Sequence, residues 1–257
     1  MPDINFDVHT EFSWFSDDWH NDDPKRVIPF LDLSVSVLYK HLNPKMFPPK
    51  NIRVIRNPQP FPQMRPGQTV NTILLRAENE LWGNYAIEFG HELCHHVVDI
   101  YPAIDPPNPD PCGWIEEFLC EFASLFIMKE MAKEVDKNDT YIEWKNAGVD
   151  LSGFADSQYG VPAPLPHPSK LIAENRENLK SRYYYRDVLK RSISNVFSVH
   201  LLTKVQDDPQ IWQCLQVFKN VTCQANLNDF LAEWKLLLTD ELKTKFETIE
   251  EAFLGNK

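Results

Sequence analysis

One short pattern, His91-Glu92-Leu93-Cys94-His95, restricts what this chain can fold into more than any other feature of its sequence. Residues four apart lie on the same face of an α-helix, so a helix here would place the two histidines side by side. Glu92 would lie about a hundred degrees further round the helix axis than His91. Apolar residues occur before and through the pattern, which predicts a helix that ends near residue 100 with its other face buried.

Two histidines at this spacing can offer two imidazole nitrogens to one metal ion. Neutral imidazole is a good ligand for Zn²⁺, and a catalytic zinc site uses three protein ligands and keeps one position open. Residues 69–77 predict a strand ahead of the helix, which is the context that this pattern needs. We therefore expect Zn²⁺ as the cofactor, bound by His91 and His95, and the rest of the sequence must supply a third ligand.

The third ligand is expected from a second helix, over residues 114–128. This segment is apolar enough to be buried, yet its first turns carry Glu116, Glu117 and Glu121. A buried carboxylate costs several kcal/mol unless it is paired or bound to a metal, so at least one of the three is expected to have a cationic partner. Two rival ligands stay open at this point, His96 and Asp99.

The two motifs together resemble those of the gluzincin family of zinc metallopeptidases, in its thermolysin-like and aminopeptidase-like forms. The resemblance covers roughly residues 50–130. It implies that His91, His95 and Glu117 bind the zinc, and that Glu121 accepts the remaining N–H of His91 and so orients the ring. Glu116 stands where the family often has asparagine, and the resemblance gives it no role.

The resemblance also implies a mechanism of peptide hydrolysis. Glu92 would accept a proton from the zinc-activated water and pass it to the leaving amine. A tyrosine on a later helix stabilises the oxyanion in aminopeptidase-like members, which implies Tyr185 here; Tyr183, Tyr184 and His200 are alternatives. The strand over residues 69–77 would form the sheet edge with which an extended substrate pairs.

The predicted fold class is α+β. A zincin-like core over residues 1–148 would combine a small mixed sheet with the two motif helices, and residues 149–257 would add a loop or lid and a mainly helical C-terminal subdomain. Residues 149–170 contain four prolines and two glycines, which predicts the irregular lid. The other expected elements are a helix over 24–41, a strand over 52–55, and helices near 171–204, 209–220 and 227–252.

Composition excludes several classes of protein. The 257 residues are 43% hydrophobic, with a net charge of −11 and no apolar run long enough to cross a membrane. The acidic balance argues against nucleic-acid and anionic-membrane partners, which leaves a peptide or protein substrate, with the oligomeric state open. An acidic N-terminus without a signal peptide, and an odd number of cysteines, lead us to expect a cytoplasmic protein.

Three functions remain in competition. The expected one is a zinc metallopeptidase. The second is a regulatory protease that cleaves one partner protein, because residues 122–128 are similar to a run found in antirepressor-cleaving peptidases. The third is an inactive zinc-stabilised interaction module. A purely structural zinc would leave Glu92 without a task, and this favours an enzyme.

Overall fold

The chain is described here by a computed structural model. The described residues are 22–43, 51–56, 62–65, 67, 70–98, 112–138, 141–146, 149–160, 166–179, 188–206, 208–222 and 226–255. The predictions made for Asp99 and for Tyr183, Tyr184 and Tyr185 lie outside these residues.

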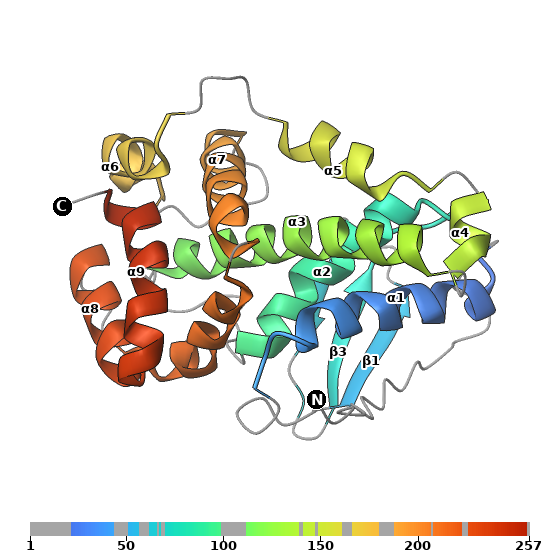
Figure 1. The fold of residues 1–257 in the computed structure, drawn as a ribbon, viewed down its shortest axis with the longest axis horizontal. Helices are drawn as coiled ribbons and strands as arrows, with labels where there is room; N and C mark the ends of the chain where they lie inside the picture. Colours follow the sequence, from blue (N-terminus) through green and yellow to red (C-terminus); the bar gives the residue numbers. More distant parts are fainter. Residues whose placement is uncertain are drawn as a thin grey trace.

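The described residues form a small mixed sheet and a larger set of helices, which confirms the α+β class (Figure 1). The sheet contains β1 (Asn51–Arg56), β2 (Gln63–Arg65) and β3 (Val70–Leu75) in the order β1-β3-β2. β1 is parallel to β3, with Asn51 opposite Val70, and β2 is antiparallel to β3, with Gln63 opposite Leu74.

The predicted sheet edge at residues 69–77 is wrong, because β3 lies between the other two strands. The edge strand nearest the histidine helix is β2. Its three residues are too few for an alternating pattern, and Pro62 and Pro66 flank them, so the sequence indicated only a proline-rich connection.

Two helices carry the motifs, α2 (Trp82–Val98) and α3 (Gly113–Lys137), and α3 continues well beyond the predicted end at residue 128. α3 runs through the middle of the molecule, with α2 and the sheet on one side and later helices on the other (Figure 1). α1 (Pro24–Tyr39) packs against both α2 and α3. Asp23 caps its N-terminus by accepting a hydrogen bond from the Lys25 amide.

The start of α2 is held by a buried carboxylate from the segment before α1. Asp22 accepts hydrogen bonds from the Asn79 amide at 3.0 Å, from the Glu80 amide and from the Tyr85 hydroxyl at 2.8 Å. Asn79 and Glu80 both have positive φ, which bends the chain sharply between β3 and α2. The direction in which α2 leaves the sheet is therefore set by a contact between segments distant in sequence.

α2 and α3 approach each other closely at small residues. A Cβ on Gly90 would lie 3.2 Å from Ser124 Cα, so a larger residue there would push the helices apart. Ser124 Oγ donates to the Ile87 carbonyl of α2 at 2.9 Å. Because Gly90 directly precedes His91, this contact brings the histidines onto the acidic face of α3.

The prediction of an irregular stretch over residues 149–170 is wrong in its first part, which forms helix α5 (Leu151–Tyr159). Asp150 caps it by accepting from the Gly153 amide at 2.7 Å. Leu151, Ala155 and Tyr159 recur every fourth residue and are buried, and this spacing is a helical signal that the nearby prolines obscured.

The C-terminal part is helical in its described residues, as predicted. The elements are α6 (Pro168–Leu179), α7 (Val188–Val205), the 3₁₀ helix η3 (Pro209–Asn220), α8 (Leu227–Leu237) and α9 (Asp240–Leu254), and a short helix that was not predicted, α4 (Ile142–Asn146), lies before residue 149. Apolar side chains from both predicted domains join one hydrophobic core. Phe122 of α3, for example, stacks on Trp212 of η3 with ring centroids 4.7 Å apart. No described helix is long and apolar enough to cross a membrane.

Candidate metal centre

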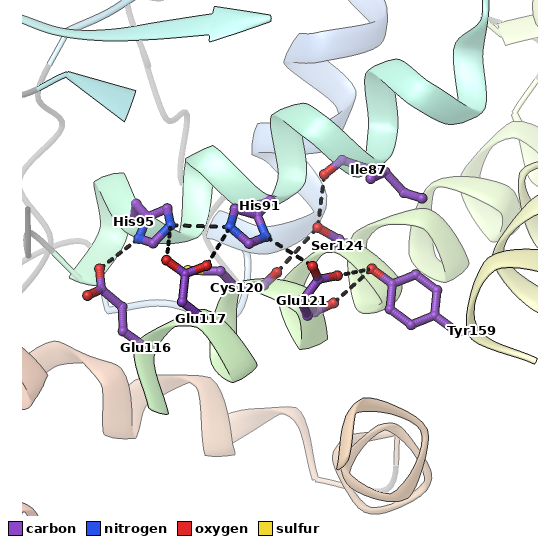
Figure 2. Close-up of polar contacts among 9 residues, drawn as sticks. All are labelled: Ile87, His91, His95, Glu116, Glu117, Cys120, Glu121, Ser124 and Tyr159. Carbon is purple, nitrogen blue, oxygen red and sulfur yellow. Dashed lines mark hydrogen bonds and ion pairs between the residues drawn. The ribbon is translucent and has the colours of Figure 1, made fainter. Parts of the chain in front are cut away.

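His91 and His95 lie side by side on α2 and point toward α3, as the helical spacing requires (Figure 2). Both are buried, with exposed fractions of 4% and 3%. Their Nε2 atoms are 3.2 Å apart. Two nitrogens bound tetrahedrally to one zinc at about 2.0–2.1 Å lie about 3.3 Å apart, so the two rings already have the spacing that a shared metal ion needs.

Glu117 faces both histidines from α3. Its Oε2 is 3.3 Å from His91 Nε2, and its Oε1 is 3.8 Å from His95 Nε2. Burial raises the pKa of this carboxyl group, but the two imidazoles outweigh burial and leave the pKa below its ordinary value. Glu117 is therefore ionised, and each of its two oxygens lies near a different one of the two imidazole nitrogens, where a carboxylate could bind the same metal ion.

The outer nitrogen of each imidazole meets a different carboxylate of α3. His95 Nδ1 and Glu116 Oε1 are 2.7 Å apart, and His91 Nδ1 and Glu121 Oε1 are 3.8 Å apart (Figure 2). A carboxylate that accepts the Nδ1–H keeps the lone pair on Nε2, where a metal would bind. Glu116 lies at hydrogen-bond distance from its imidazole and Glu121 does not, so the orienting role expected for Glu121 stays a prediction. Sequence reasoning missed Glu116, although three acids on one buried helix were a usable signal.

Glu92 is buried beside the histidines, with an exposed fraction of 1%. Among the described residues its Oε1 has no hydrogen-bond partner. Burial raises its pKa, against the lowering effects of His95 and His91 and of a hydrogen bond from the Met64 backbone in β2. Glu92 thus lies between the metal-binding side chains and the edge strand, with one oxygen available to a ligand.

The electrostatic balance of the centre favours a bound cation. Burial lowers the pKa of His91, but Glu117 and Glu121 outweigh it and raise the pKa to about 9. Burial also lowers the pKa of His95, and Glu116 with its acidic neighbours raises it well above the ordinary value. A divalent cation among these carboxylates can take the place of the protons on the two imidazoles.

Cys120 also faces this point. Its sulfur and one nitrogen each of His91 and His95 lie within 4.8 Å of one another. Cys94 and Cys120 are both buried, and sequence reasoning missed the position of Cys120 next to the histidines. Burial and the adjacent Cys94 raise the pKa of the Cys120 thiol well above its usual range, whereas a metal ion bound to the sulfur would deprotonate it.

Two other candidate residues lie elsewhere. His96 Nδ1 is 2.8 Å from Asn71 Nδ2, on the sheet side of α2. His200 lies in α7 and belongs to a different group of side chains, which also contains His167 and Glu251. A residue that sequence reasoning missed is Lys190 of α7, which is buried and whose positive charge helps to lower the pKa of Glu117.

We predict that Tyr159→Phe weakens metal binding by roughly 10-fold, the lower end of the cost of losing an orienting partner. The Tyr159 hydroxyl donates to Glu121 Oε2 at 2.9 Å and to the Glu121 carbonyl at 3.2 Å (Figure 2). Its loss frees Glu121 to leave His91. Competition with a zinc chelator measures the change, and Ser157→Ala on the exposed side of α5 is the control. If Tyr159→Phe bound zinc as tightly as the Ser157→Ala control, Tyr159 would have no role in metal binding.

No protein family model, no curated protein and no solved structure matches this chain. What the centre does must therefore be inferred from its own residues.

Proposed function

We propose that the chain is a zinc metallopeptidase of gluzincin type, with His91, His95 and Glu117 as the zinc ligands in a zincin-like core. The observation that carries the proposal is that the Nε2 atoms of two histidines lie together beside the Glu117 carboxylate while a buried Glu92 oxygen next to them has no partner among the described residues. A structural zinc site has four protein ligands and no open position, so it would not require such a carboxylate.

Each side chain then has a task. Zinc bound here would lower the pKa of its water to about 7 and polarise a carbonyl oxygen. Glu92, with its pKa raised by burial, would accept a proton from the water and donate it to the departing amine. Glu116 and Glu121 would hold the two imidazoles in the orientation and tautomer that bind metal.

The remaining parts of the proposal concern substrate and setting. An extended peptide would pair with the edge strand β2, because the Met64 backbone lies next to Glu92. Tyr185 remains the proposed oxyanion donor, with Tyr183 and Tyr184 as alternatives. We place the enzyme in the cytoplasm, because Cys94, Cys120 and Cys214 are free thiols.

We expect the purified protein to contain close to one zinc per centre and to hydrolyse a mixed peptide pool. A chelator should abolish hydrolysis, and added zinc should restore it, because the ligands position the ion that activates water. Elemental analysis and mass spectrometry of the pool are the measurements. Hydrolysis that survives complete zinc removal would contradict the proposal. Cleavage of one captured protein and of no pool peptide would instead favour the regulatory protease.

The interaction module is a second candidate because Cys120 could supply a fourth ligand. A site of His91, His95, Glu117 and Cys120 would be closed to substrate, like other structural zinc sites. The Glu92 oxygen without a partner among the described residues would have no task in such a closed site, which favours the peptidase. A protein that binds zinc tightly, loses it on Cys120→Ser and hydrolyses no peptide would be this module.

A further inference from the structure

A second group of metal-binding side chains lies among the C-terminal helices. It contains His167, His200 and Glu251, and one donor atom from each lies within 4.8 Å of the other two. All three residues are half-buried. None of them belongs to the motifs of α2 and α3.

Three helices that pack against one another bring the group together. His167 directly precedes α6, His200 lies in α7, and Glu251 lies in the last turn of α9 (Figure 1). The rings of His167 and His200 meet edge to face with centroids 4.7 Å apart. His167 Nδ1 is 2.8 Å from Ser169 Oγ, which fixes the ring from its outer side.

The polar atoms of this group are available to a ligand. His167 Nε2 is buried, and within the described part of the chain it has no hydrogen-bond partner. Burial, His167 and Lys204 lower the pKa of His200, and Glu251 raises it. Glu251 adds a negatively charged oxygen ligand to the two imidazoles.

We propose that His167, His200 and Glu251 form a second metal site, which binds a divalent transition-metal ion such as Zn²⁺ and joins α6, α7 and α9. Two imidazoles and one carboxylate suit zinc and its neighbours in the first transition row, whereas Mg²⁺ and Ca²⁺ prefer sites made of oxygen atoms. Binding through His167 Nε2 would place the ring proton on Nδ1, so the Ser169 amide, which donates to Nδ1 at 3.3 Å, would give way to a hydrogen bond from Nδ1–H to Ser169 Oγ. The flexible Glu251 side chain supplies the small closure that bonding distances require.

Zinc stoichiometry tests this site independently of the peptidase proposal. We expect the wild type to bind a second equivalent of zinc by equilibrium dialysis, and Glu251→Gln and His167→Gln each to lose that equivalent. The Tm of the wild type should also rise with added zinc after the first equivalent is bound, because an ion that binds only the folded chain stabilises it. Neither variant should show this further rise.

Glu247→Gln is the matched control, because Glu247 lies one turn earlier in α9 and contacts Lys235 at the surface, 3.4 Å away. It should retain both equivalents. Equal zinc binding by the wild type, Glu251→Gln and His167→Gln would overturn the proposal, as would an equal loss in Glu247→Gln. Circular dichroism establishes whether each variant is folded. If His167→Gln does not fold, Glu251→Gln decides the test, because it alters only one half-buried side chain.

Discussion

Glutamine in place of Glu92 is expected to leave zinc bound and to lower the rate of peptide hydrolysis by at least about 100-fold. The residue contributes no ligand atom in the proposed centre, so its loss should spare metal affinity. Glutamine has nearly the same size and can still form hydrogen bonds, but it cannot accept a proton. Because Glu92 is buried beside the histidines with its pKa raised, no nearby solvent-exposed acid can replace it.

The measurement is hydrolysis of a mixed peptide pool by wild type and variant at equal zinc occupancy. Glu88→Gln is a suitable control, since Glu88 lies one turn earlier on α2 and accepts hydrogen bonds from the Arg76 and Ala77 amides instead of facing the centre. Equal rates in Glu92→Gln and wild type would remove Glu92 as the base. A wild type that cleaves no peptide or protein would favour the interaction module.

Substitution of Glu117 by alanine is expected to lower zinc affinity more than the loss of an orienting carboxylate does. Loss of an orienting carboxylate costs about 10- to 100-fold, and we expect this for Glu121→Ala. Loss of a ligand should exceed that range, because only His91 and His95 would then hold the ion. Chelator competition measures all three proteins on one scale.

Two further variants make this assignment decisive. Cys120→Ser should keep nearly full affinity if the buried thiol is not a ligand, and a loss equal to that of Glu117→Ala would indicate a closed four-ligand site. Asp99→Ala addresses the rival ligand one turn after His95. Full affinity in Glu117→Ala together with a loss in Asp99→Ala would transfer the third ligand position to Asp99.

The sequence by itself determined the parts of the centre that depend on one helix. His91 and His95 are four residues apart, so any α-helix there places them on one face, and their Nε2 atoms meet at 3.2 Å. The sequence also predicted that the glutamates of α3 have cationic partners, because charged side chains on an apolar helix need such partners wherever that helix packs. The helical C-terminal part followed from apolar periodicity in the same way.

Only the tertiary structure decided which partner each group meets. Glu116 reaches His95 and Glu121 reaches His91 because α2 crosses α3 at Gly90 and Ser124, and no local pattern specifies a crossing. Tyr159 reaches Glu121 from a helix 38 residues further along the chain.

The edge strand β2 also could not be predicted from its local sequence, because Gln63–Arg65 is a strand only through its pairing with β3. Helical spacing is a property of consecutive residues and can be read from them. Contacts between distant segments depend on how whole elements pack, and several packings satisfy the same local pattern.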